Sequence, residues 1–288
     1  EAAVTAAGES YGDVDNVLGS GEFTVTEWVP NDHYTLARNE KYWGEMPIAT
    51  TITCRVIPEG SARAIALEAG EVDLVWNVDA TDCANIEANP DVTLLSQTSS
   101  SIEYLGMNTT KEKFKDVRVR QAINYALDKQ AFVDTIIEGR GTVANSYINS
   151  MIPGWTDEVE AYPYDPEKAK ALLKEAGYPD GFDVNLWCAY NDSASVKAVQ
   201  VIQQQLALVG VRAKITVLEA GERVARIHNV KRPEDSTLEL YYTGWAASSD
   251  ADWSLRPLYY GPSMPPVLFN TAYYRNPEVD KLIDEALS

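Results

Sequence analysis

Strand-like and helix-like segments alternate along most of this chain, and this alternation limits the fold more than any other feature. Thr51 to Ile57 is β-branched and alternating, Pro58 to Glu68 has a helical pattern that ends at Gly70, and Val72 to Val78 again has the composition of a strand. A strand, a helix and a second strand within about thirty residues are what a βαβ unit requires. The sequence therefore predicts an α/β protein.

The rest of the chain continues the alternation. Two short strands are expected at Phe23 to Val29 and Tyr34 to Arg38, joined by the turn Pro30-Asn31-Asp32. Further elements have clear start or stop signals, with Asp, Ser or Asn as N-caps and Gly as the terminator. They are helices capped by Asp116, by Asp128 (Lys129 to Glu138), by Asp165 (before Gly177), by Ser193 (before Gly210) and by Asn276, and strands at Val184 to Tyr190, Val211 to Leu218 and Leu238 to Thr243.

Charge and hydrophobicity exclude several classes of partner. The 288 residues include 43 acidic and 24 basic side chains, which gives a net charge of −19. The electrostatic field of this negative charge repels nucleic acids and anionic membrane surfaces, so we expect no nucleic-acid partner. No run approaches the roughly 18–20 apolar residues that span a bilayer. The first residues carry no signal-peptide pattern, but a cleaved signal would leave the same picture.

Neither the cysteines nor the histidines form a recognisable chemical motif. Cys54, Cys83 and Cys188 are far apart and odd in number, which fits neither a zinc site nor a disulfide framework. We expect at least two of them to be buried thiols. His33 and His228 lie far apart in the sequence, and no phosphate-binding loop, nucleophile elbow or HExxH motif is present. No catalytic residue, cofactor or metal site is therefore predicted.

Asp250 and Asp252 are the strongest carboxylate pair in the chain. At this spacing they could bind a hard cation, act as an acid–base pair or contact a ligand. The alternative is structural: a helix cap in the turn Ser248-Ser249-Asp250, or an ion pair with Arg256.

Aromatic residues indicate a binding cleft. Several lie in turn-like, polar surroundings: Trp155, Trp187, Tyr190, Trp245, Trp253, Tyr259 and Tyr260. Trp187 and Tyr241 are expected to be core residues of strands. Trp245 and Tyr190, beside Ser, Asn and Asp, are typical of a cleft that binds a small polar ligand.

Several long motifs, in the same order, resemble one known family. They are IPEGSAR (Ile57 to Arg63), LEAGEVD (Leu67 to Asp73), FKDVRVRQAI (Phe114 to Ile123) and YDPEKAKALLKEAGY (Tyr164 to Tyr178). These runs look like the peptide- and nickel-binding receptors of ABC importers, bacterial extracellular solute-binding protein family 5. The resemblance extends over essentially the whole chain from Gly19 onward.

Within that family, the chain is most similar to the glutathione-binding subgroup. The similar runs are Tyr242 to Trp245, Asp250 to Trp253, Arg256 to Leu258, Pro265-Pro266 and Leu268 to Tyr274. The family's dipeptide receptors have an aspartate after the Gly-Trp pair for the ligand amine, whereas this chain has Ala246, Ala247 and Ser248. They also have an arginine in the loop after the Leu-Trp strand for the ligand carboxylate, and Ala189 to Ser193 has none. These departures favour glutathione or another modified peptide over an ordinary dipeptide.

The resemblance implies a fold and a function. The fold would be the two-lobed α/β fold of periplasmic binding proteins (type II, enlarged peptide-binding class), present as a fragment that lacks part of the first lobe. Residues 1–103 would be the later part of lobe I and 104–288 most of lobe II, with a hinge near 99–110. Such a receptor is no enzyme. It would act as a monomer at the periplasmic or outer face of the membrane, and whether it carries a lipid anchor is left open. It would close around a small peptide and deliver the peptide to the ABC permease subunits.

The resemblance and the aromatic pattern together give a set of expected ligand contacts. They are Tyr104, Asn108, Tyr190, Asn191, Trp245, Ser248, Ser249, Asp250 and Arg256. Asp250 would accept a hydrogen bond from a ligand amine, and Arg256 would pair with a carboxylate. Each has a structural alternative: Arg256 neutralises Asp250 or Asp252, and Asn108 caps a turn. Two other functions stay open, a hydrolase of peptides that uses Asp250 and Asp252, and a ligand-sensing module of a chemoreceptor.

Overall fold

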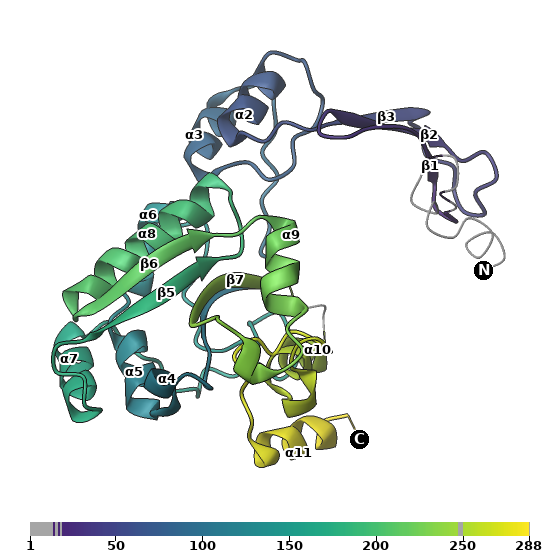
Figure 1. Cartoon of the computed structure of the whole chain (residues 1–288). Coiled ribbons are helices and arrows are strands. Elements are labelled where there is room, and N and C mark those ends of the chain that lie inside the picture. The colour runs from purple at the N-terminus through teal and green to yellow at the C-terminus, as the bar shows by residue number, and fades with distance from the viewer. Residues whose placement is uncertain (1–13, 15–16, 18, 247–249, 288) are drawn as a thin grey trace. The chain divides into compact units, whose positions relative to one another are not determined.

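The computed structural model describes residues 14, 17, 19–246 and 250–287, and the chain divides into two compact units (Figure 1). Unit 1 is Glu1–Val78 and unit 2 is Asp79–Ser288. The hinge between lobes predicted near 99–110 is a property of a receptor that closes, and it stays a prediction.

Unit 1 is built on a three-stranded antiparallel sheet of order β1-β2-β3. Its strands are β1 (Phe23–Val29), β2 (His33–Arg38) and β3 (Thr51–Arg55), followed by helix α2 (Gly60–Glu68). Asn31 adopts a positive φ of 62° in the predicted turn between β1 and β2. Asn tolerates this left-handed conformation better than most residues, which explains why it suits this turn. The three strands and the helix occur where the sequence predicts them, with ends shifted by one to two residues.

The predicted βαβ unit at residues 51–78 is wrong. Residues 72–78, all described, form bends and no strand. Asn77 has a φ of 58°, which is incompatible with an extended strand, and its carbonyl accepts a hydrogen bond from Arg63 Nη2 at 2.9 Å. Leu74 and Trp76 are 75% and 79% exposed, so no neighbouring strand buries them. Strand propensity without a partner to pair with does not stabilise a strand.

Unit 2 contains a four-stranded mixed sheet of order β4-β7-β5-β6. Its strands are β4 (Ser101–Met107), β5 (Phe182–Cys188), β6 (Val211–Val217) and β7 (Leu240–Ala246). β5 lies parallel to both β6 and β7, whereas β4 runs antiparallel to β7. The parallel pair β5–β6 needs a crossover, which the helix between them supplies. This arrangement confirms the predicted α/β class.

Helices complete unit 2 (Figure 1). They are α3 (Ala80–Ala88), α4 (Glu112–Lys115), α5 (Val117–Tyr125), α6 (Lys129–Ile136), α7 (Pro166–Glu175), α8 (Ser193–Leu208), α9 (Ala220–Arg223), the π-helical turn η3 (Val224–His228), the 3-10 turns η4 (Pro233–Asp235) and η5 (Gly261–Ser263), α10 (Ala251–Tyr259) and α11 (Pro277–Glu285). The predicted caps Asp116, Asp128 and Asp165 each accept a hydrogen bond from a backbone N–H of the first turn.

The cap of α8 is Asp192, not the predicted Ser193. One carboxylate oxygen of Asp192 accepts from the backbone N–H of Ser195 at 2.9 Å and the other from its hydroxyl at 2.7 Å. A carboxylate satisfies two donors at once and also favours the positive end of the helix dipole. Ser193 is the first helical residue instead, and its hydroxyl donates to Asp79 at 3.1 Å.

The core of unit 2 occupies both faces of its sheet. On one face, Leu186 and Leu240 contact α5, α7 and α8 through fully buried side chains such as Ile123 and Leu206. On the other face, Trp187 and Tyr241 pack with Ile227 of η3. The alternation of strand side chains assigns even-numbered residues of β5 and β7 to the first face and odd-numbered ones to the second. The predicted core positions of Trp187 and Tyr241 are thus confirmed.

The cysteines are free thiols. Cys83 and Cys188 are 5% and 0% exposed, and Cys54 is half-buried. Burial raises the pKa of both Cys83 and Cys188. The expectation of at least two buried thiols is confirmed.

Candidate functional site

A pocket of about 320 Å³ lies in unit 2, on the face of the sheet that carries Trp187 and Tyr241. It is lined by aromatic side chains with hydroxyls and a few polar groups among them. The lining residues are Tyr104, Tyr190, Arg223, Val224, His228, Tyr241, Thr243, Gly244, Trp245, Phe269 and Thr271. We call this cavity the β4–β7 pocket.

The pairing of β4 with β7 forms the floor of the pocket. Tyr104 of β4 lies opposite Thr243 of β7 in the antiparallel register. Because strand side chains alternate between faces, Tyr241, Thr243 and Trp245 all point to the side that Tyr104 shares. Burial raises the pKa of Tyr104 well above its usual value and that of Tyr241 to about 12, so both phenols are neutral donors at neutral pH.

Tyr190 and Arg223 line the pocket at the carboxyl end of β5. The Tyr190 hydroxyl accepts a hydrogen bond from the backbone N–H of Gly244 at 3.3 Å. The guanidinium of Arg223, at the end of α9, lies 5.4 Å from the centre of the Tyr190 ring and donates to the carbonyl of Ala189 at 2.9 Å. Two segments distant in the sequence are thereby joined at one edge of the pocket.

Trp245 and Phe269 form an aromatic wall. Their ring centres are 5.3 Å apart, and the ring centre of Trp253 lies 5.7 Å from that of Trp245. The Trp245 indole N–H donates to the backbone carbonyl of Trp253 at 3.0 Å, which fixes the ring orientation. Tilted aromatic pairs at such distances stabilise each other beyond their buried area. The wall is therefore an ordered, apolar surface.

Charge in the pocket is sparse. Among the lining residues only Arg223 and His228 can carry a positive charge, and none is acidic. His228 is half-buried, and its ring and that of Phe269 form a T-shaped pair with centres 5.3 Å apart. Its Nδ1 atom has no hydrogen-bond partner among the described residues. Burial, and next the charge of Arg223, lower the pKa of His228 below 6.5. His228 is therefore neutral at neutral pH, and Arg223 is the one lining residue charged there.

Three of the predicted contact residues meet in this pocket: Tyr104, Tyr190 and Trp245. Arg223, His228 and Phe269 also line the pocket, and the sequence does not predict them as contacts. No local signal distinguishes these residues, because they approach Tyr190 and Trp245 only through the packing of α9, η3 and the segment after η5.

Two further predicted residues lie outside the pocket lining and are used within the fold. Asn108 is 1% exposed, donates to the Leu238 carbonyl at 2.9 Å and accepts from the Thr110 backbone and hydroxyl. Asn191 donates to both carboxylate oxygens of Glu219 at 3.2 Å. Ser248 and Ser249 lie outside the described residues. A ligand contact of any of these four stays a prediction.

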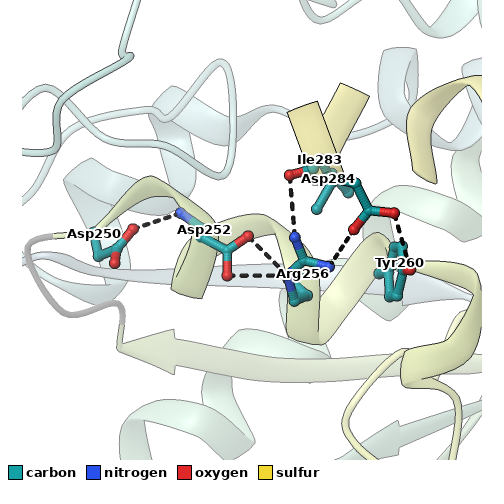
Figure 2. Close-up of polar contacts among 6 residues, drawn as sticks. All are labelled: Asp250, Asp252, Arg256, Tyr260, Ile283 and Asp284. Atoms are coloured by element: carbon teal, nitrogen blue, oxygen red, sulfur yellow. Dashed lines mark hydrogen bonds and ion pairs between the residues drawn. The ribbon is translucent and has the colours of Figure 1, made fainter. Parts of the chain in front are cut away.

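Asp250, Asp252 and Arg256 form an interaction network of their own (Figure 2). Asp250 caps α10 by accepting from the Asp252 backbone N–H at 2.8 Å. The Arg256 Nε donates to both oxygens of Asp252, at 2.8 and 3.0 Å, and its Nη1 donates to Asp284 at 2.8 Å. The ring of Tyr260 stacks 4.7 Å from this guanidinium.

This network agrees in part with the structural alternative for these residues, a helix cap and an ion pair with Arg256. Arg256 pairs with Asp252 and connects α10 to α11, while Asp250 acts as a cap. A side chain that already forms hydrogen bonds within the fold must break them before it can bind a ligand, and this costs free energy. A ligand role of Asp250 or Arg256 stays a prediction.

A second hollow of about 470 Å³ lies along the outer side of β5 and β6, lined by exposed Asp183, Asn185, Arg212 and Lys214 among others. Asp183 and Arg212 pair with each other at 2.6 Å in this open surface. It lacks the aromatic, enclosing character of a ligand pocket. Within the part of the chain that is described, no cluster of three or more metal-binding side chains occurs, and no helix has the length and apolar character to cross a bilayer.

An α/β unit with an aromatic pocket at the carboxyl end of a strand is a common design for binding small molecules. The comparisons with known proteins define the class. Residues 2–265 match the family described as bacterial extracellular solute-binding proteins, family 5 Middle. The chain therefore belongs to this family, whose members are solute-binding proteins rather than enzymes, as the sequence predicted.

Relatives and solved structures agree with this assignment. The chain is 36% identical over 272 residues to the glutathione-binding protein GsiB of Escherichia coli O1:K1, covering 94% of this chain and 53% of that protein. The DppA protein of Helicobacter pylori, solved with the peptide STSA, has a TM-score of 0.83 at 29% identity, over 93% of this chain and 51% of its own. The AppA oligopeptide-binding protein of Bacillus subtilis, solved with a nonapeptide, has a TM-score of 0.83 at 26% identity, over 98% and 59%.

The predicted periplasmic-binding-protein-like α/β fold is confirmed, because both solved structures are peptide-binding proteins of that fold. The chain spans about half the length of the relatives that it matches.

Proposed function

We propose that this chain belongs to the extracytoplasmic receptor of an ABC importer, which binds glutathione or a similar small peptide and delivers it to the membrane permease. The β4–β7 pocket would hold part of that peptide. The observation that carries the proposal is the meeting of Tyr104, Tyr190 and Trp245 in one pocket of a family 5 chain. The receptor would act as a monomer at the periplasmic or outer face of the membrane.

The chemistry of the lining supports a peptide ligand. Tyrosine and threonine hydroxyls can satisfy the amide groups of a bound peptide, which would otherwise cost free energy on leaving water. Trp245 and Phe269 offer flat apolar surfaces for side chains and the peptide backbone. The similarity to GsiB, at 36% identity, supports glutathione as the first ligand to test.

Calorimetry with reduced glutathione, oxidised glutathione and unmodified dipeptides tests this proposal. We expect saturable binding of a glutathione form, weaker binding of dipeptides, and recovery of the ligand chemically unchanged. At a free ligand concentration of about 100 Kd, the native state should gain about 2.7 kcal/mol, visible as a raised Tm. Preferred binding of dipeptides would contradict the glutathione assignment, and turnover would contradict the receptor function.

A matched pair of variants links binding to the pocket. Trp245→Ala removes one of the two rings of the aromatic wall and should weaken binding at least about tenfold, the loss typical for an aromatic anchor. Trp155→Ala is the control, because Trp155 is 42% exposed and does not line the pocket. Equal affinities of the two variants would remove the pocket from the proposal.

Uptake of radiolabelled glutathione by cells with and without the protein separates import from ligand sensing. Import requires that uptake falls when the protein is absent. A ligand-sensing module would leave uptake unchanged while binding the same ligand.

A further inference from the structure

Arg223 has no acidic partner among the residues that the structure describes, although the chain has 43 acidic and 24 basic residues. Arg226, three residues further on, pairs with Glu222 at 2.5 Å, and Arg256 pairs with two aspartates. Among the described residues, no carboxylate lies within ion-pair distance of Arg223. Its positive charge is therefore uncompensated locally.

The guanidinium of Arg223 is held in place while most of its donors stay unused. Its Nη1 donates to the Ala189 carbonyl at 2.9 Å, and its centre lies 5.4 Å from the Tyr190 ring. No hydrogen bond joins its Nε or Nη2 to a described residue. A guanidinium carries five donors in a planar fork that matches a carboxylate. Arg223 is thus a fixed, half-buried cation with free donors at the edge of the pocket.

The lining of the β4–β7 pocket is complementary to a single anionic group. It contains no acidic residue, and its tyrosine and threonine hydroxyls can donate hydrogen bonds. A carboxylate that enters would gain charge-assisted hydrogen bonds, and it would meet no like charge among the lining residues.

We propose that Arg223 binds a carboxylate of the ligand, so that the β4–β7 pocket takes the carboxylate-bearing end of a peptide. This inference rests on the proposed function and specifies which part of the ligand the pocket receives. The loop Ala189 to Ser193 contains no arginine of its own. Arg223, which ends α9, contacts that loop through the Ala189 carbonyl.

The experiment combines ligand and protein changes. The probes are glutathione and two analogues in which either the glycine carboxylate or the glutamyl α-carboxylate is replaced by a carboxamide. The protein variants are Arg223→Gln, Arg223→Lys and the control Arg226→Gln, whose side chain stacks 4.2 Å from Trp187 and does not line the pocket. Calorimetry gives Kd for each combination, and thermal unfolding checks that each variant is folded.

We expect one of the two carboxamide analogues to bind the unmodified chain roughly ten- to hundredfold more weakly than glutathione, the typical effect of losing a hydrogen bond to a charged group. Arg223→Gln should bind glutathione as weakly and no longer distinguish it from that analogue. Arg223→Lys should be intermediate because it keeps the charge without the fork. Arg226→Gln should behave as the unmodified chain.

Two results overturn the assignment while leaving the proposed function intact: a folded Arg223→Gln variant that binds glutathione within twofold of the unmodified chain, or one that still distinguishes the acid from both carboxamides. An unmodified chain that binds no glutathione overturns the proposed function, and the assignment of Arg223 with it.

Discussion

At the scale of single residues, the neighbours of a side chain decide its role. Arg223 and Arg256 are both arginines near aromatic rings, 5.4 Å from Tyr190 and 4.7 Å from Tyr260. Arg256 has two carboxylate partners in a network that joins two helices, whereas Arg223 faces a pocket without acidic residues. The same residue type therefore joins two helices at one position and is a candidate for ligand recognition without an acidic partner at the other.

The pKa of His33 should lie above 6.5 and that of His228 below it. The pKa of His33 is raised by its hydrogen bonds to Asp32, at 2.7 Å, and Glu27, at 3.2 Å. That of His228 is lowered by burial and by Arg223. Because the chain contains only these two histidines, NMR should give two separate imidazole titrations, assigned with His33→Gln and His228→Gln. Two overlapping curves near 6.5 would contradict both shifts.

Opposite dependences of stability on pH follow from these shifts. The raised pKa of His33 stabilises the fold fully below its unfolded value of about 6.5, and this contribution is lost as pH rises through the folded value. The lowered pKa of His228 has the reverse sign: stability is full above about 6.5 and falls as pH decreases through the folded value. His33→Gln should therefore destabilise the protein at pH 5.5 more than at pH 9 in urea unfolding.

At the scale of elements, local signals and packing agree over most of the chain. The stripe of α8 illustrates this: Val199, Ile202 and Leu206 recur at helical spacing and are buried against β5 and β6. The segment 72–78 is the counterexample, since its strand-like composition has no pairing partner. Element type is thus predictable where periodicity is long, and uncertain where a short segment depends on a neighbour.

The two leucines near the end of α8 should respond very differently to truncation. Leu206 is 0% exposed and Leu208 is 61% exposed on the same helix. Leu206→Ala leaves a cavity and should lower the free energy of unfolding by about 2–5 kcal/mol. Leu208→Ala should change it by no more than about 0.5 kcal/mol. Urea denaturation measures both, and equal effects would mean that the helix packs by another face.

At the scale of the whole molecule, the buried core is distributed very unequally. Both large hydrophobic clusters lie in unit 2. Among the described residues of unit 1, only Ala64 and Ala66 are buried, while Trp43 and Ile48 are 82% and 98% exposed. A sheet without a buried face contributes little to stability by itself.

Hydrogen exchange of the whole chain should reflect this inequality. Amides of β1, β2 and β3 should exchange by local opening, on the order of a hundredfold or more faster than those of β5 and β7, whose exchange requires global unfolding. Mass spectrometry after pulse labelling resolves the two groups. Similar protection in both units would mean that the sheet of unit 1 is stabilised as strongly as the core of unit 2.

The sequence by itself determined the α/β class, most strands and helices, the family and the aromatic character of the site. These properties depend on local patterns: periodicity, caps such as Asp165, and motifs a few residues long. Only the tertiary structure decided which residues meet. Asp284 comes from α11 to pair with Arg256 of α10, and Arg223 reaches Ala189 across 34 positions. Contacts between residues so far apart depend on how complete elements pack, and a local pattern carries no information about that packing.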